Sequence, residues 1–96
     1  DLSRLVAQAP DDATLVVFHT AVLGYVTPHA ERAAFARTVR DLKVVWISNE
    51  LPELFPNLTV GLRKPWPSGC FLLSMNEQPI AWTDAHGTFI DWIAQY

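Results

Sequence analysis

Two short, continuously apolar stretches constrain the fold of this chain most strongly. They are LVVF at residues 15–18 and VVWI at residues 44–47. Runs of this length that are rich in β-branched residues and lack a polar face are typical of strands covered on both sides. Residues 28–42 between them carry apolar side chains at helical spacing, and roughly two dozen residues are enough for a right-handed crossover. The pattern predicts a parallel β-α-β unit.

The remaining helical segments are predicted to be short. Residues 2–9 have the apolar spacing of one helical face, and residues 20–26 form at most a helical turn. Four prolines exclude long regular structure from residues 51–68, so we expect a loop there with one helical turn at 52–55.

The C-terminal part of the chain predicts an antiparallel hairpin. Its strands are residues 71–75 and 80–83, joined by a short polar turn at 76–79. Residues 87–96 fit either a short closing helix or an extended tail packed on the sheet. We therefore expect one α/β domain over residues 1–96, with a small mixed sheet of four strands in the order 1-2-4-3.

Composition excludes several classes of function and location. Seven basic residues against ten acidic ones provide no field that would attract a nucleic acid. No segment approaches the roughly 20 apolar residues of a membrane-spanning helix, and the start does not resemble a signal peptide. A single cysteine, Cys70, permits no internal disulfide and no zinc spacing. We expect a cytoplasmic protein in which Cys70 is a buried hydrophobe.

The chain is apolar enough to need a partner. Half of its residues are hydrophobic and four are tryptophan, and Trp66, between two prolines, is the tryptophan that we expect to be exposed. In the predicted strand order the first strand lies at an edge, where it is an association hazard. We expect a homodimer through residues 14–18 or the faces beside them, or else a missing N-terminal domain that covers this edge.

Three segments resemble the C-terminal region of a bacterial family of uncharacterised proteins. They are TLVVFHTAVLGYV, VVWISNELPELFP and PIAWTDAHGTFIDWI. Members of that family are several times longer than this chain, so the resemblance implies that the chain is the C-terminal part of a longer protein. It transfers no active-site residues, because the family has no established activity.

The predicted order of elements is also similar to the C-terminal half of Rossmann-like methyltransferases that use S-adenosylmethionine. The first strand with HTAVLGYV after it is similar to the region after the fourth strand in that superfamily. The resemblance implies methyl transfer by an intact longer protein. The glycine-rich loop that holds the cofactor would lie in the missing half, and the four glycines present form no such loop. We therefore expect S-adenosylmethionine to bind only to an intact longer protein, and the chain to be inactive alone.

Polar residues follow the two apolar strands, at the edge of the sheet where ligands of α/β proteins bind. The candidate ligand-binding residues are His19, Thr20, Ser48, Asn49 and Glu50, with Asn76 joining them if the first hairpin strand runs parallel to the others. His19 and Glu50 are the candidate catalytic residues, because a histidine near a carboxylate can perform acid–base chemistry near neutral pH. The alternative is structural, since His19 could cap the following turn or donate a hydrogen bond to a backbone carbonyl.

Two further groups have structural interpretations. Asp84 and His86 are too few to form a closed metal site, so we predict no metal and place them at the sheet end opposite His19. Ser48 lacks the G-x-S-x-G elbow of a serine hydrolase.

The helix predicted at residues 28–42 carries three arginines. They are Arg32, Arg37 and Arg40, which we interpret as a solvated face supported by an Arg37–Asp41 pair. An anion-binding stripe is the alternative. Two functional hypotheses therefore result from the sequence: the C-terminal portion of a methyltransferase-like protein, or a non-catalytic binding or assembly module.

Overall fold

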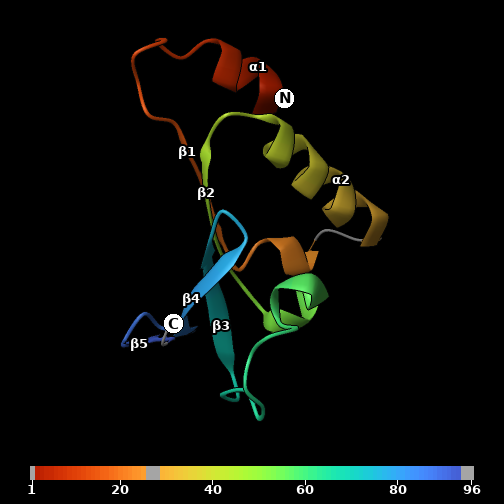
Figure 1. Ribbon diagram of the computed structural model, residues 1–96, viewed down its shortest axis with the longest axis vertical. Coiled ribbons are helices and arrows are strands. Elements are labelled where there is room, and N and C mark those ends of the chain that lie inside the picture. Colours follow the sequence, from red (N-terminus) through yellow and green to blue (C-terminus); the bar gives the residue numbers. More distant parts are fainter. Residues whose placement is uncertain (1, 26–28, 94–96) are drawn as a thin grey trace.

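The computed structural model describes residues 2–25 and 29–93. A single sheet with five strands, in the order β1-β2-β3-β4-β5, forms its framework. The elements in chain order are α1 (Leu2–Ala7), β1 (Val16–Thr20), η1 (Leu23–Tyr25), α2 (His29–Asp41), β2 (Val45–Glu50), η2 (Pro52–Leu54), η3 (Pro56–Leu58), β3 (Cys70–Met75), β4 (Gln78–Asp84) and β5 (Ile90–Trp92) (Figure 1). No helix among these described residues is long and apolar enough to cross a membrane.

The predicted β-α-β unit is confirmed. β1 and β2 are parallel neighbours, with Val17 beside Trp46 and His19 beside Ser48, and α2 forms the connection between them. β1 lies at the edge of the sheet, as predicted. The helix ends close to its predicted boundary, whereas its predicted first residue, Pro28, lies outside the described residues.

The predicted four-strand order 1-2-4-3 is wrong. β3, not β4, is the antiparallel neighbour of β2, with Glu50 opposite Leu72. This arrangement follows from the loop at residues 51–69, which leaves β2 and enters β3 at the same end of the sheet. Near the start of β2, Asn76 of the turn between β3 and β4 bonds to the backbone of Trp46 as a neighbouring strand would. Its N–H donates to the Trp46 carbonyl at 2.7 Å, and its Oδ1 accepts the Trp46 N–H at 2.9 Å.

A fifth strand, β5, forms within residues 87–96, for which the sequence was compatible with either a short helix or an extended tail. The chain reverses at Gly87, which has a φ of 70°, a conformation that glycine adopts without a steric penalty. The carboxylate of Asp84 accepts the backbone N–H groups of Thr88 and Phe89. The tail therefore returns along β4, whose edge would otherwise be unpaired, and pairs there as β5.

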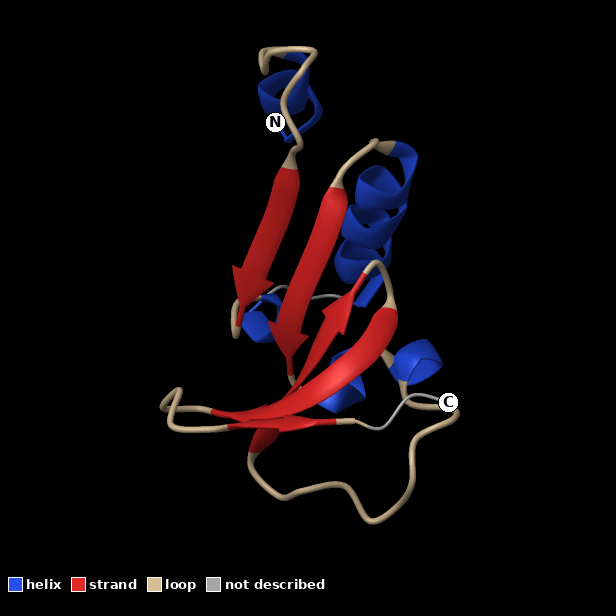
Figure 2. Cartoon of the chain, turned by 60° about the vertical axis from the view of Figure 1, so that its left-hand side comes forward, coloured by secondary structure: helices blue, strands red, loops and turns tan. Residues whose placement is uncertain are grey.

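The Rossmann resemblance is not matched, because the helices cover only one face of the sheet (Figure 2). The core lies on that covered face, in two clusters. One contains Ala36, Val39 and Trp46 with Phe35 and Phe55 against them, and the other contains Cys70, Leu72 and Trp82 with Trp66. Cys70 is buried and free, as predicted, whereas the prediction that Trp66 is the exposed tryptophan is wrong.

The opposite face, here called the open face, is largely apolar, and no helix of the described residues lies over it (Figure 2). The strand registers place on it Val16, Phe18, Thr20, Val45, Ile47, Asn49, Phe71, Leu73, Met75, Ala81, Thr83, Ile90 and Trp92. None of these residues is charged. Trp92 on edge strand β5 is 67% exposed, and Phe18 on edge strand β1 is 59% exposed. Large apolar side chains therefore contact solvent at both edges of the open face.

Replacing Val39 with alanine tests the packing of α2 on the sheet. Val39 is 2% exposed, so we expect the substitution to lower the free energy of unfolding by about 1.5–3 kcal/mol, from lost burial and the cavity left behind. Val60→Ala is the matched control, because Val60 is 84% exposed and should change stability by less than about 0.5 kcal/mol. Urea unfolding followed by tryptophan fluorescence measures both, and equal losses would contradict the assignment of the core.

Candidate functional site

The two candidate catalytic residues lie in direct contact. His19 at the end of β1 and Glu50 at the end of β2 are 2.6 Å apart, measured from Nδ1 to Oε2. His19 is 9% exposed and Glu50 is 2% exposed, so the pair is buried on the covered face of the sheet, between the strands and the helices. The parallel register of the two strands brings these residues together, as the sequence predicted.

Trp46 determines which nitrogen of His19 carries the proton. Its indole Nε1 lies 2.9 Å from His19 Nε2. Because an indole N–H can only donate, Nε2 must accept with its lone pair, and the proton of the neutral imidazole lies on Nδ1. The Nδ1–H group therefore donates to the Glu50 carboxylate.

Glu50 also binds the chain that follows β1. Its Oε2 accepts the Val22 N–H at 3.3 Å and its Oε1 accepts the Leu23 N–H at 3.2 Å. Ala21 turns the backbone toward the carboxylate with a φ of 55°, a conformation that is unfavourable for a residue with a Cβ. A hydrogen bond from the Ala21 N–H to the Asn49 carbonyl supports this turn. One carboxylate thus joins β1, β2 and the start of η1.

The resulting network leaves His19 without a free basic nitrogen. A general base must accept a proton on a lone pair that can reach the substrate, and the lone pair of Nε2 already faces the indole of Trp46. Phe35 covers the imidazole edge-on at a ring distance of 5.4 Å. This geometry supports the structural interpretation of His19 and Glu50.

The other predicted residues at this edge lie on both faces of the sheet. Ser48 is buried on the covered face opposite Ser74, whereas Thr20 and Asn49 belong to the open face. Asn49 Nδ2 donates to Thr20 Oγ1 at 3.0 Å, and Thr83 Oγ1 donates to Asn49 Oδ1 at 2.8 Å. These three side chains form a polar row across the open face, because successive residues of a strand point to opposite sides.

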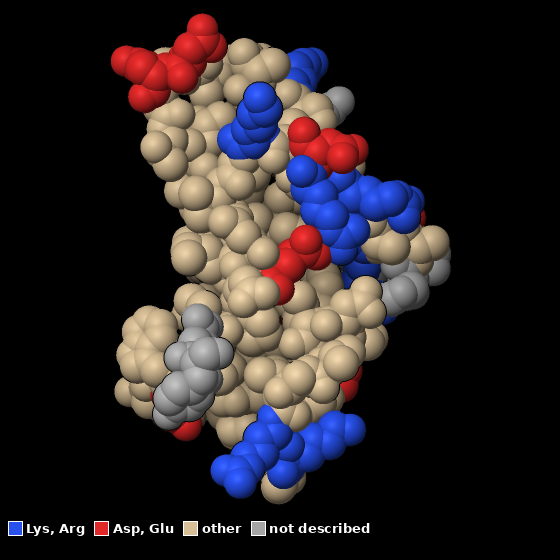
Figure 3. Space-filling model, in the orientation of Figure 1, with Lys and Arg blue, Asp and Glu red and all other residues tan. Residues whose placement is uncertain are grey.

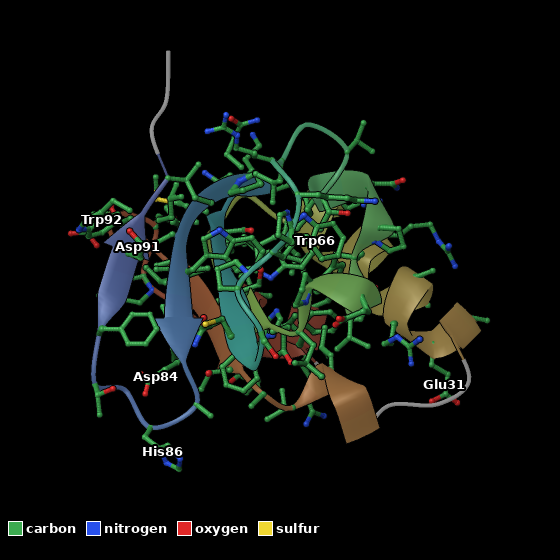
Figure 4. The ribbon with its side chains drawn as sticks, turned by 90° about the horizontal axis from the view of Figure 1, so that it is seen from below. Glu31, Trp66, Asp84, His86, Asp91 and Trp92 are labelled. Atoms are coloured by element: carbon green, nitrogen blue, oxygen red, sulfur yellow. The ribbon has the colours of Figure 1, made fainter. Side chains whose placement is uncertain are left out.

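Two placements from the sequence are wrong. Asn76 lies at the other end of β2, since β3 runs antiparallel to it, and therefore does not join the candidate site. β4 runs in the same direction as β2, so Asp84 and His86 follow the end of the sheet where His19 lies, not the opposite end. His86 points away from the body of the molecule (Figure 4). The described residues contain no cluster of three or more potential metal ligands.

Asp84 stabilises the turn that leads into β5. Its carboxylate accepts the Thr88 hydroxyl and the N–H groups of Thr88 and Phe89. These bonds, the Thr88 hydroxyl first among them, hold the pKa of Asp84 below its ordinary value.

Sequence reasoning missed the role of Trp46 as the partner of His19. The sequence pattern places Trp46 only within the apolar strand predicted at residues 44–47. The signal was the strand register, because Val17 opposite Trp46 places the indole diagonally beside His19 on the same face. That register requires the two strands to be aligned, and the sequence predicts only that they are neighbours.

Residues 1–92 match a family described as uncharacterized proteins conserved in bacteria, DUF2332. The chain belongs to this family. The DUF2332 match confirms the family resemblance of the three quoted segments and carries no activity with it. No curated protein and no solved structure matches the chain, so the likeness to methyltransferases gains no support from the comparisons.

Replacing Trp46 with phenylalanine tests the hydrogen-bonded network of this DUF2332 chain. The change leaves His19 Nε2 buried without a donor, which should lower the free energy of unfolding by about 1–3 kcal/mol beyond the loss of packing. Trp82→Phe is the matched control, because Trp82 is also buried and no hydrogen bond of its indole is present within the described residues. Urea unfolding measures both, and equal losses would show that the Trp46–His19 bond contributes nothing.

Replacing Thr88 with valine tests the turn at Asp84. A carboxylate whose folded pKa is lowered stabilises the fold fully above its unfolded pKa of about 3.9, and this stabilisation disappears as pH falls through the lower folded value. Thr88→Val should raise the Asp84 pKa toward its ordinary value, measured by NMR titration of the carboxyl carbon. Thr88→Ser keeps the hydroxyl and should keep the lowered pKa. An unchanged pKa in the valine variant would refute the role of the hydroxyl.

Proposed function

We propose that this DUF2332 chain is a non-catalytic assembly module whose open face binds a second copy of the chain. The single observation that carries the proposal is the uncharged apolar sheet face, on which Phe18 and Trp92 are more than half exposed. Contiguous exposed apolar surface on a folded protein marks a site of interaction.

The exposed area of the chain supports this proposal. A folded monomer of 10.8 kDa is expected to expose about 5,500 Å². The chain exposes 6772 Å², an excess of about 1,200 Å², whereas a protein interface of standard size buries about 800 Å² on each partner. The radius of gyration, 14.2 Å against about 12.5 Å for a compact chain of this length, agrees with an uncovered flank.

A second copy fits this surface because the open face is free of charge. Each chain has a formal net charge of -3, which opposes association through charged surfaces. Two open faces can meet without bringing like charges together, in the manner of two sheets packed about 10 Å apart. In such an arrangement Phe18 and Met75 of one copy interdigitate with apolar side chains of the other, and the polar row at Asn49, whose members bond to one another, crosses the contact.

The hypothesis of methyl transfer requires His19, Asn49 and Glu50 to line one open acceptor cleft. Instead, His19 and Glu50 use their polar atoms within the covered face, and Asn49 lies on the other side of the sheet. The arrangement favours the non-catalytic alternative.

Sedimentation equilibrium between about 10 μM and 1 mM tests the proposal. We expect a mass of twice 10.8 kDa at the upper concentrations. Phe18→Asp should weaken dimerisation by about a hundredfold, because it places a charge within the apolar contact. A monomer at all concentrations would contradict the proposal, leaving a different protein domain as the occupant of the open face.

Val60→Asp is the matched control for this experiment. Val60 is exposed and apolar, like Phe18, and lies in the loop between η3 and β3, away from the open face. It should leave the dimer unchanged. Equal weakening by the two substitutions would place the contact elsewhere.

A further inference from the structure

A second surface feature lies on the covered side of the sheet, independent of the proposed dimer. It is a cavity of about 330 Å³ between α2, the η2–η3 segment and the turn that joins β3 to β4. This volume falls at the lower end of the range of about 300–1,000 Å³ for small-molecule sites.

The walls of this cavity are apolar. Ala33 and Ala36 of α2 leave space where larger side chains would fill it, and Leu54 and Leu58 face them from η2 and η3. Phe55 also lines the cavity and packs edge-on against Trp46 at a ring distance of 6.3 Å. Because Trp46 is itself held by His19, this wall is supported by the buried network.

Two arginines and one glutamate line the cavity beside these apolar walls. Arg40 donates to both carboxylate oxygens of Glu77, from Nε at 2.9 and 3.0 Å and from a terminal nitrogen at 2.6 Å, and this bond raises the pKa of Arg40. Arg37 has no carboxylate partner within the described residues, so the predicted Arg37–Asp41 pair does not form there. The lining therefore carries one positive charge in excess.

Basic side chains gather on the surface over α2 (Figure 3), and two arginines of this helix, Arg37 and Arg40, line the cavity. The sequence leaves open whether they are a solvated face or an anion-binding stripe. The position of Arg37 beside an apolar cavity favours anion binding, because a guanidinium donates two parallel hydrogen bonds to a carboxylate.

We propose that this cavity binds a small amphipathic carboxylate. Its apolar body lies between Ala33 and Leu58, and its carboxylate pairs with Arg37. Glu77 neutralises Arg40 and repels a second negative charge, so the site takes a monoanion in preference to a dianion. A carboxylate at the end of a peptide has the same head group, and its much larger apolar and polar body does not fit the cavity volume.

NMR titration of the full chain with octanoate tests this proposal. We expect saturable shifts of the backbone amide signals of Ala33, Ala36 and Leu58. Octan-1-ol has the same apolar body without the charge and should bind about tenfold more weakly, which corresponds to the loss of one charge-assisted hydrogen-bonded pair. A peptide ending in an apolar residue with a free carboxylate should give no shifts at these positions. Equal affinity for octanoate and octanol, or shifts produced by the peptide, would overturn the proposal.

Substitutions identify the groups that bind the probe. Arg37→Gln should weaken octanoate binding about tenfold and leave octanol binding unchanged. Arg63→Gln, at an exposed arginine that does not line the cavity, should change neither. Ala33→Leu should abolish binding of both probes by filling the cavity, and circular dichroism checks that the variant is folded. Should Ala33→Leu fail to fold, the arginine pair still decides the outcome.

The open face is the other apolar surface that octanoate could reach. Phe18→Asp should leave the affinity for octanoate unchanged, because the cavity lies on the opposite side of the sheet. Shifts confined to Phe18 and Trp92, or equal affinities for the Arg37→Gln and Arg63→Gln variants, would overturn the proposal.

Discussion

The buried carboxylate of Glu50 is the interaction on which the arrangement of the β-α-β unit depends. A charge that is 2% exposed requires compensation, and it obtains three donors: the imidazole N–H of His19 and the backbone N–H groups of Val22 and Leu23. Trp46 completes the network by donating to the other nitrogen of His19. Together these bonds align β1 with β2 and determine where the chain turns after β1.

This network also occupies the polar atoms of the two candidate catalytic residues, His19 and Glu50. Residues that would be reactive in a solvated cleft are here bonded to one another, and their polar atoms face inward. The same indole that bonds to His19 supports Phe55 in the wall of the cavity beside α2. The buried polar pair thus helps to hold this wall in place.

The two sides of the sheet differ in charge and in cover. The covered side carries the helices, the core clusters and the arginines of α2, whereas the open face carries neither charge nor helix. A β-sheet buries its apolar residues effectively only when both faces are covered or when one face is polar. The proposed contact between two open faces would meet this requirement, and it would leave the covered side accessible to a small ligand.

The sequence by itself determined the elements that depend on local pattern. The apolar runs before His19 and at Trp46, with helical spacing between them, specified a parallel β-α-β unit, its edge strand and the meeting of His19 with Glu50. Tertiary structure alone decided the position of β3, the pairing of β5, and the bond between Trp46 and His19. These features depend on strand register and on which edge is free to pair, and a shift of one residue would reverse every side chain between the two faces. Local periodicity does not encode that choice; it follows from contacts between segments distant in the chain, such as Asn76 with the backbone of Trp46.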